Sequence, residues 1–319
     1  MHTLRRILFV ALTGIALGAV ALVVWLHWPR PGPAPMDVAT TAADGATTVT
    51  WLGVSGALLR KGDSAVMIDP FFTRRPDKLG LVLNRPVAPD EARVRAWLKR
   101  LGVQRLDAVA VSHSHYDHAL DAGLVARLTG ARLVGSASTA NIGRGAGLPE
   151  SRIVTVAPGM AVDAGAFTLR FHPSRHAGAT GGRPRGTIDA PLTPPATALA
   201  YRLGGAWSIA VTHPDGSVLH HGSAGFEPGA LRAVRADTVL LGVAMIDDLP
   251  RYLAAVVDTV DADQVYAVHW DDFTRPLSAP LQPLPLGVDL PGFLSAARAA
   301  RPGIRFATLP LGQPVSLAR

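Results

Sequence analysis

The stretch that decides the fold is Leu106–His118, LDAVAVSHSHYDH. Its first half, 106–111, has the apolar composition of a short buried strand. The strand ends in a run of metal-capable side chains, namely His113, His115, Asp117 and His118. Loops at the carboxyl ends of strands are where open α/β sheets commonly keep their sites. The sequence therefore predicts a metal site at the end of a buried strand.

The chain contains no cysteine, which restricts the chemistry of such a site. Disulfides, thiolate ligands and a cysteine nucleophile are all excluded. A metal must then be held by histidine, aspartate or glutamate. Imidazole and carboxylate ligands suit zinc, and a catalytic zinc site keeps at least one position for water.

The flanking sequence predicts a layered α/β domain. Between Thr47 and Phe72, two apolar runs broken by Lys61-Gly62-Asp63 indicate a hairpin. Helical spacing predicts helices at 88–102, 119–128 and 249–260. Further strands are predicted at 152–156, 165–172, 197–203, 207–212, 217–221, 238–243 and 264–268, the last ending at His269. Strands alternate with helices, without a repeat of the solenoid type.

The N-terminal segment has the composition of a membrane anchor. Residues 7–26 carry no charge, and at about 1.5 Å per residue they are long enough to cross a hydrocarbon core of about 30 Å. Arg5 and Arg6 precede them, which places the N-terminus in the cytoplasm and the rest outside, in the periplasm of a Gram-negative cell. The alternative is a cleaved signal peptide and a secreted protein, although signal peptides usually have an apolar region of about 7 to 15 residues.

These features divide the chain into three parts. Residues 1–28 form the transmembrane helix or signal, and 29–46, rich in Pro, Ala and Thr, form a flexible linker. Residues 47–319 form the folded domain. The formal charge of +7 comes from arginines scattered along the chain, so no nucleic-acid surface is predicted.

Three motifs together resemble the metallo-β-lactamase superfamily: strand-HSHYDH, FHPSRHAG around His176, and AVHWDDF around His269. The resemblance covers residues 47–275. Within this region, the sequence is most similar to the branch that contains N-acyl-phosphatidylethanolamine phospholipase D and ascorbate-phosphate lactonase. It implies a four-layer αββα sandwich and a zinc-dependent hydrolase with one or two ions, other divalent metals remaining open. The implied ligands are His113, His115 and His176 for one ion, and Asp117, His118 and His269 for the other. His172 is a rival to His176.

The sequence departs from this family pattern at the end of one strand. Relatives carry Gly-Asp-Thr/Ser-Gly there, with an Asp that bridges both metals, whereas this chain has Ser223 at the bridging position. A neutral hydroxyl cannot bridge two dications as a carboxylate does, so the second ion is expected to bind more weakly. Strand alternation puts His221 on the face of Ser223, as a substitute ligand, a proton-transfer group or a packed histidine. Val54 replaces a frequent family histidine, which indicates altered substrate handling.

The predicted mechanism is hydrolysis of an ester, lactone or phosphodiester. A metal lowers the pKa of bound water from about 15.7 to about 7, and Asp117 is the predicted catalytic residue that orients the resulting hydroxide. Asp69 either orients a ligand imidazole or caps a turn.

The irregular stretch 177–195 is the predicted substrate wall. Four arginines either select an anionic small-molecule or lipid-derived substrate or are simply solvated: Arg74, Arg75, Arg183 and Arg185. Two alternatives to hydrolysis stay open at this point, a catalytically degenerate domain that binds a metal or a partner, and a di-iron redox protein of the same fold.

Overall fold

The computed structural model describes residues 2–28, 32, 34, 45–74, 80–81, 83–178, 181–285 and 287–317. It divides into two compact units, Met1–Gly32 and Pro33–Arg319. The first unit contains helix α1 (His2–His27), which confirms a helix at the predicted place. Within the described residues, however, no helix has the length and apolar character needed to cross a membrane, so the predicted transmembrane helix is not supported. Most of the predicted linker, 29–31, 33 and 35–44, lies outside the described residues.

The second unit is built on two sheets, each of seven strands within the described residues. The first sheet has the order β14 (Pro314–Ser316), β1 (Thr48–Gly53), β2 (Gly56–Lys61), β3 (Ser64–Ile68), β4 (Ala108–Ala110), β5 (Arg132–Gly135), β6 (Ile153–Thr155). The second has the order β13 (Arg305–Thr308), β12 (Gln264–Val268), β11 (Thr238–Gly242), β10 (Gly216–His221), β9 (Ala206–His213), β8 (Phe167–Ser174), β7 (Ala161–Ala164). Strands β3 to β6 are parallel to one another, as are β10 to β13.

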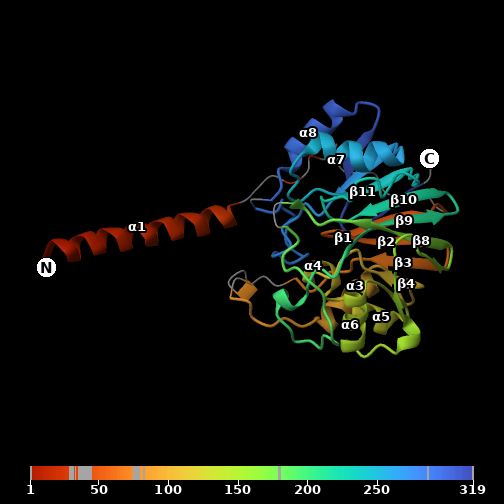
Figure 1. Ribbon diagram of the computed structural model, residues 1–319, viewed down its shortest axis with the longest axis horizontal. Helices are drawn as coiled ribbons and strands as arrows, with labels where there is room; N and C mark the ends of the chain where they lie inside the picture. Colours follow the sequence, from red (N-terminus) through yellow and green to blue (C-terminus); the bar gives the residue numbers. More distant parts are fainter. Residues whose placement is uncertain are drawn as a thin grey trace. The chain divides into compact units, whose positions relative to one another are not determined.

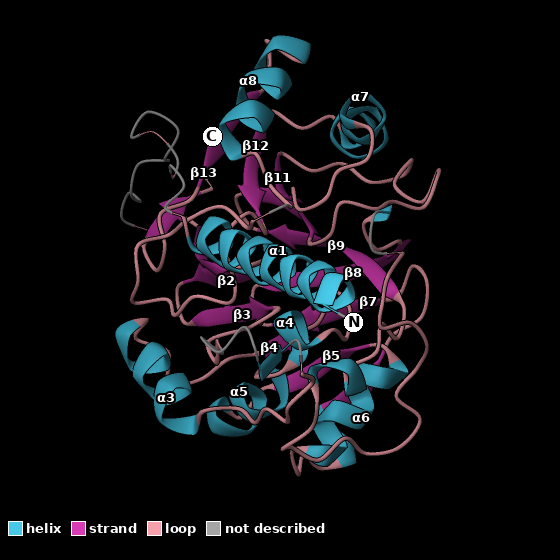
Figure 2. Ribbon diagram, turned by 90° about the vertical axis from the view of Figure 1, so that its left-hand side faces the viewer, coloured by secondary structure: helices cyan, strands magenta, loops and turns pink. Residues whose placement is uncertain are grey.

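Helices cover the outer face of each sheet, which gives the predicted αββα sandwich (Figure 1). The first sheet is covered by α3 (Glu91–Arg100), α5 (Ala122–Thr129) and α6 (Ala137–Gly145), and the second by α7 (Leu249–Leu253) and α8 (Leu290–Ala300). Figure 2 shows these helices above and below the strands. Helix α3 is typical: Asp90 caps it by accepting from the Arg93 N–H, and Val94, Trp97 and Leu98 form its buried stripe.

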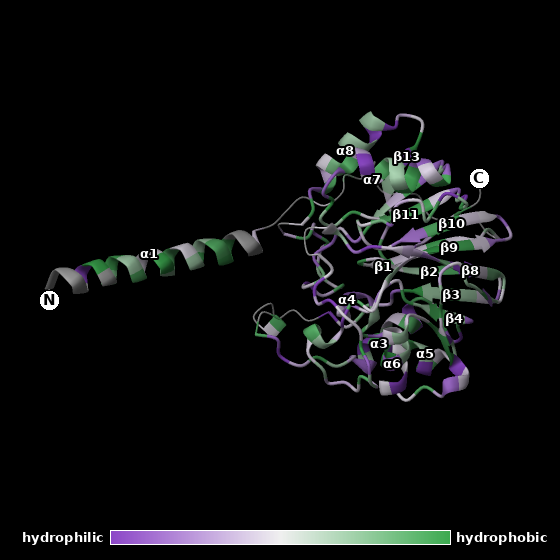
Figure 3. Ribbon diagram, viewed as in Figure 1, coloured by the Kyte–Doolittle hydropathy of each residue, from purple (hydrophilic) through white to green (hydrophobic). Residues whose placement is uncertain are grey.

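Because both faces of each sheet are covered, inner strands such as β4 and β11 are largely apolar (Figure 3), whereas β10 also carries His220 and His221. On β4, Ala108 and Ala110 belong to the core between the sheets, whereas the alternate residue Val109 and the following Val111 belong to the core under the helices. The small alanines let the two sheets approach each other. Strand β4 is therefore packed on both faces, and its carboxyl end leads directly into the site.

Two sequence predictions meet different outcomes here. The predicted strand at 197–203 is wrong, because the chain forms only one 3-10 turn, Ala198–Ala200, and joins no sheet. Pro194 and Pro195 just before it have no N–H to offer a ladder. The predicted helix at 249–260 is confirmed as α7 followed by a π-helical turn, Ala254–Asp258.

Candidate metal centre

The HSHYDH run leaves β4 at the edge where the parallel strands end. The backbone continues the sheet for one more residue, since the Val111 N–H donates to Val134 O at 2.9 Å. His115 then stands at the N-cap of the one-turn helix α4 (Tyr116–Ala119), which carries Asp117 and His118. Strand and helix together present the four predicted side chains within one tight turn of chain.

Two groups of metal-capable side chains meet at this edge. The first cluster comprises His113, His115 and His176, and the second cluster comprises Asp117, His118 and His269; in each, the candidate ligand atoms lie within 4.8 Å of one another. These are the two sets implied by the resemblance. His113 and His118 connect the clusters, with ring centroids 3.8 Å apart.

Strands of the second sheet deliver the two remaining histidines. His176 follows β8, and its ring centroid lies 5.0 Å from that of His113 and 4.8 Å from that of His115. His269 follows β12, and its Nε2 lies 3.4 Å from Asp117 Oδ2. The rival His172 lies within β8 itself and belongs to neither cluster.

The donor atoms of both clusters suit a cation. His113 Nε2, His118 Nε2 and His269 Nδ1 are buried and have no hydrogen-bond partner among the described residues. Buried polar atoms without partners are rare in folded proteins and call for an ion or a water molecule. A set of imidazoles and a carboxylate is the ligand set that zinc prefers, so the residues fit a divalent metal.

Burial keeps the imidazoles of the first cluster in the form that binds metal. Desolvation, reinforced by the neighbouring histidines, lowers the pKa of His176 to about 4 and holds the pKa of His113 well below its usual value. Desolvation likewise lowers the pKa of His115. Neutral imidazole is the ligand form, so these rings are ready for a metal at neutral pH without losing a proton.

Asp69 supports the second cluster from behind. Its Oδ2 lies 2.8 Å from His118 Nδ1, 2.8 Å from Ser55 Oγ and 2.5 Å from Ser112 Oγ, and its Oδ1 accepts from the Ser112 N–H at 2.7 Å. Burial opposes ionisation, but His118 outweighs burial and brings the pKa of Asp69 below its usual value. When His118 donates Nδ1–H to this carboxylate, its Nε2 faces Asp117 as the free ligand atom. Of the two predicted roles, the geometry favours orientation of a ligand.

Ser223 and His221 are not placed alike. Ser223 lines the pocket beside the clusters, and its Oγ accepts from the N–H of Ala177, the residue after His176, at 3.0 Å. His221 is buried on the other side of β10, where its Nδ1 lies 2.8 Å from Ser208 Oγ and its ring lies 5.6 Å from that of Tyr252. The structure therefore does not bring His221 to either cluster, and the packed-histidine alternative describes it. Its neighbour His220 faces the site instead, with Nε2 at 2.7 Å from Ser55 O.

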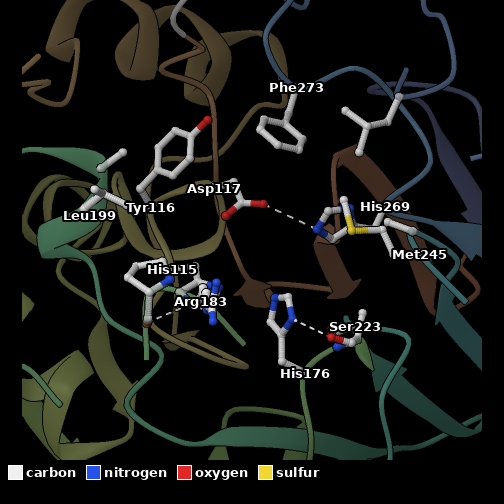
Figure 4. Close-up of a pocket in the computed structure, with 15 residues that line it drawn as sticks. His115, Tyr116, Asp117, His176, Arg183, Leu199, Ser223, Met245, His269 and Phe273 are labelled. Carbon is white, nitrogen blue, oxygen red and sulfur yellow. Dashed lines mark hydrogen bonds and ion pairs between the residues drawn. The ribbon is translucent and has the colours of Figure 1, made fainter. Parts of the chain in front are cut away.

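A pocket of about 200 Å³ opens in front of the clusters (Figure 4). Asp117, His115, His176 and His269 are among the residues that line it. The rest is largely apolar, with Tyr116, Pro184, Ala198, Leu199, Ala244, Met245, Phe273 and Leu284 among its lining residues. The predicted substrate wall contributes Ala177, Arg183 and Pro184.

The predicted arginines that the structure describes lie in different environments. Arg183 lines the pocket, as an anion-selecting residue must. Arg185 is exposed and donates Nε–H to Gly181 O. Arg74 is buried in an ion pair with Asp271, so it is neither a substrate contact nor a solvated arginine. Arg75 lies outside the described residues.

Val54 does not reach the pocket, contrary to the expectation that it marks substrate handling. It is buried, its backbone has a φ of 49°, and its carbonyl oxygen accepts from the His269 N–H at 2.6 Å. Sequence reasoning missed this role because the contact is made by the backbone and leaves no residue-type signal.

Two facing sheets between helices, with adjoining His/Asp clusters where the strands end, define the class: an αββα sandwich with a metal centre at its edge. Residues 49–254 match the model of the Metallo-beta-lactamase superfamily, and the chain belongs to that superfamily.

Some of the similar proteins are described as metal-dependent hydrolases. The chain is similar to a metal-dependent hydrolase of Myxococcus xanthus, with 34% identity over 128 residues, 38% of this chain and 38% of the relative. It thus spans well under half the length of this curated relative. By structure it is similar to Igni18, a metallo hydrolase from Ignicoccus hospitalis, with a TM-score of 0.54 and 16% identity over 86% of this chain and 99% of the other. A possible metal-dependent hydrolase from Veillonella parvula matches with a TM-score of 0.53 and 16% identity, covering 85% and 100%.

Proposed function

We propose that this protein is a metal-dependent hydrolase of an ester, lactone or phosphodiester. The observation that carries the proposal is the pair of clusters, with unpartnered buried ring nitrogens, at the base of a pocket. His113, His115 and His176 would hold one ion, and Asp117, His118 and His269 the other. A bound zinc supplies Lewis-acid polarisation of the scissile carbonyl or phosphoryl oxygen and acidifies water.

We assign the handling of the proton to Asp117. It lines the pocket, and its Oδ2 lies 3.4 Å from His269 Nε2 and 3.6 Å from His118 Nε2. Burial opposes its ionisation, but His118 and His269 outweigh burial and hold the pKa of Asp117 well below its usual value. An ionised carboxylate at this position orients a nucleophilic water and accepts its proton.

The pocket favours a substrate with an apolar part and an anionic group. Tyr116, Leu199, Met245 and Phe273 give an apolar wall, and Arg183 stands beside His115 as a cation (Figure 4). Small-molecule and lipid-derived substrates both fit this description. The motifs around His113, His176 and His269 support placement in the branch of N-acyl-phosphatidylethanolamine phospholipase D and ascorbate-phosphate lactonase, with Val54 and Ser223 as departures.

The N-terminal segment supports export of the hydrolase domain. Arg5 and Arg6 before the uncharged residues 7–26 are the pattern of a leader that directs the rest of the chain out of the cytoplasm. Fractionation of cells that express the full chain, with a C-terminal tag, tests this. Recovery in the membrane fraction indicates an anchor, and recovery in the periplasmic or secreted fraction indicates a cleaved signal. Recovery in the cytoplasm contradicts export.

The decisive experiment combines metal analysis with turnover. The purified full chain is expected to carry zinc or another divalent ion and to hydrolyse members of a panel of anionic esters, lactones and phosphodiesters. The test variant Asp117→Asn keeps the size of the side chain and is expected to retain metal at the first cluster. Its turnover is expected to fall by about 100-fold or more, which is the contribution typical of a positioned general base. Unchanged turnover in Asp117→Asn would rule out the role of this carboxylate.

A second function is favoured by one observation, the neutral Ser223 in place of the bridging carboxylate. In that case the domain binds a metal or a partner without catalysis. A metal-loaded protein that turns over no member of the panel supports this alternative.

A further inference from the structure

A buried ion pair lies behind the second cluster. Arg74 Nη2 is 2.6 Å from Asp271 Oδ2, and the two side chains are 1% and 0% exposed. Arg74 ends the described segment that follows β3, and Asp271 stands two residues after His269. Neither side chain belongs to a cluster, so the pair calls for another role.

A short chain of hydrogen bonds leads from this pair to His269. Asp271 Oδ1 accepts from the Val54 N–H at 2.8 Å, and Val54 O accepts from the His269 N–H at 2.6 Å. Val54 and His269 both have left-handed backbones, with φ of 49° and 55°. Residues other than glycine keep such conformations only when their surroundings enforce them, and a β-branched valine least readily. The ion pair is part of what enforces them here.

The same segment also reaches His118. Ser55, the residue after Val54, places Oγ 2.8 Å from His118 Nδ1 and 2.8 Å from Asp69 Oδ2. On its other side the segment is packed closely, because a Cβ at Gly53 would lie 2.0 Å from Arg74 Nη2. Residues 53–55 therefore fit between the Arg74 guanidinium and two of the three members of the second cluster.

We propose that Arg74 and Asp271 are positioning residues for the second metal ion. The pair fixes the backbone of Val54, and Val54 in turn fixes the backbone of His269. Because Ser55 follows Val54 in the chain, the pair also fixes the hydroxyl that contacts the ring of His118. This inference rests on the proposed function, since it requires the second cluster to hold an ion. The contacts of Val54 and Ser55 reach His269 and His118, which are both members of the second cluster, so the effect of the pair falls mainly on the second ion.

Three variants separate positioning from stability. Arg74→Met leaves the Asp271 carboxylate buried without its partner, which is strongly unfavourable and displaces the segment. Asp271→Asn leaves the Arg74 charge unpaired but keeps an oxygen for the Val54 N–H. The double variant removes both charges and keeps that oxygen. The matched control is Arg301→Met, which breaks an ion pair of equal length, 2.6 Å to Asp258, that is 29% and 36% exposed.

The measurement is titration of the metal-free full chain with Co²⁺, followed by its visible absorption and by competition with a chelator. Wild type is expected to bind two ions in separable steps. Arg74→Met is expected to weaken the second step by about tenfold or more while the first step stays within about threefold, and the double variant is expected to recover most of the loss. Arg301→Met is expected to match wild type. If Arg74→Met does not fold, Asp271→Asn and the double variant carry the comparison.

The outcomes distinguish this inference from the proposed function. Unchanged affinities for both ions in folded Arg74→Met and Asp271→Asn, with only a lower melting temperature, overturn the inference and leave the hydrolase proposal standing. Equal weakening of both steps also overturns it, because a general loss of stability acts on both clusters. Wild type that binds a single ion removes the second site and the inference with it, and wild type that binds none overturns the proposed function too.

Discussion

Ser223 stands at the position where the resemblance predicts a bridging carboxylate. Its hydroxyl lines the pocket and accepts from the Ala177 N–H at 3.0 Å, so it ties the His176 loop to the end of β10. A hydroxyl does this without adding charge. Serine here keeps the loop in place while the two clusters together hold only one carboxylate, Asp117.

The variant Ser223→Asp is expected to bind the second ion more tightly, by about tenfold or more, because it adds a negative charge beside a dication and keeps an acceptor for Ala177. Metal titration of wild type and variant measures this. Ser223→Asn is the neutral control and is expected to resemble wild type. Equal affinities in all three proteins would show that the missing charge does not matter.

Asp121 is a buried carboxyl whose ionisation opposes folding. Its Oδ2 accepts from the N–H groups of Phe72 and Thr73, at 2.6 and 2.7 Å, yet burial outweighs these bonds and raises the pKa to about 6. An unfolded aspartate loses its proton near pH 3.9. Between about pH 4 and pH 6 the folded state therefore binds more protons than the unfolded state, and this residue lowers stability as the pH rises.

Asp121→Asn is expected to remove that decline, because an amide keeps the oxygen that accepts from Phe72 and Thr73 and never ionises. Relative to wild type, the variant is expected to gain about 3 kcal/mol in free energy of unfolding between pH 4 and pH 7, from a shift of about two pKa units. Urea unfolding of both proteins across this range gives the difference. A difference that stays constant with pH contradicts the assigned pKa.

At the scale of elements, strand β10 shows what sequence periodicity predicts and what it cannot. Alternation correctly predicts that His220 and His221 point to opposite sides of the strand, toward Ser55 and Ser208 respectively. It fails at the next step, because β10 ends at His221 and the alternation does not continue through Gly222 to Ser223. Periodicity alone therefore predicts that His221 faces the site, whereas His220 does so.

His221→Gln is expected to leave metal content and metal affinity unchanged, since His221 lies outside both clusters. It is expected to lower the melting temperature, because it disturbs a buried contact with Ser208. Metal analysis and thermal unfolding on the same sample provide both readings. Loss of an ion in a folded His221→Gln protein would restore this residue as a ligand.

The strands that carry the site are the most predictable elements. The strands before His113 and His269 are mostly apolar, as is typical of strands covered on both faces. The short turn at 198–200 resembles a strand in sequence because its alanines suit several structures, and its lack of strand partners is a tertiary property. The charge of Arg74 likewise does not reveal its burial, because its partner Asp271 lies almost two hundred positions away in the sequence.

At the scale of the whole molecule, each cluster draws on both sheets. The first sheet supplies the residues after β4, and the second supplies His176 after β8 and His269 after β12. A bound ion is therefore a cross-link between two halves of the core. Ligands that bind only the folded state stabilise it, by about 2.7 kcal/mol when present at 100 times the dissociation constant.

Removal of metal with a chelator is expected to lower the melting temperature by several degrees, at about 2 °C or more for each kcal/mol lost. Added zinc is expected to restore it. A variant with His113→Ala and His176→Ala is the control, and its melting temperature is expected to respond less to the chelator. Identical melting temperatures with and without metal, in wild type that has been shown to bind it, would contradict a cross-link between the sheets.

The joining of both sheets at the clusters has a consequence for the lifetime of the protein. A chain that emerges where its metal is scarce keeps its two halves together through the core alone, and it opens more often to proteases. The amount of this protein in a cell is then expected to rise and fall with the supply of the metal, independently of how strongly its gene is expressed.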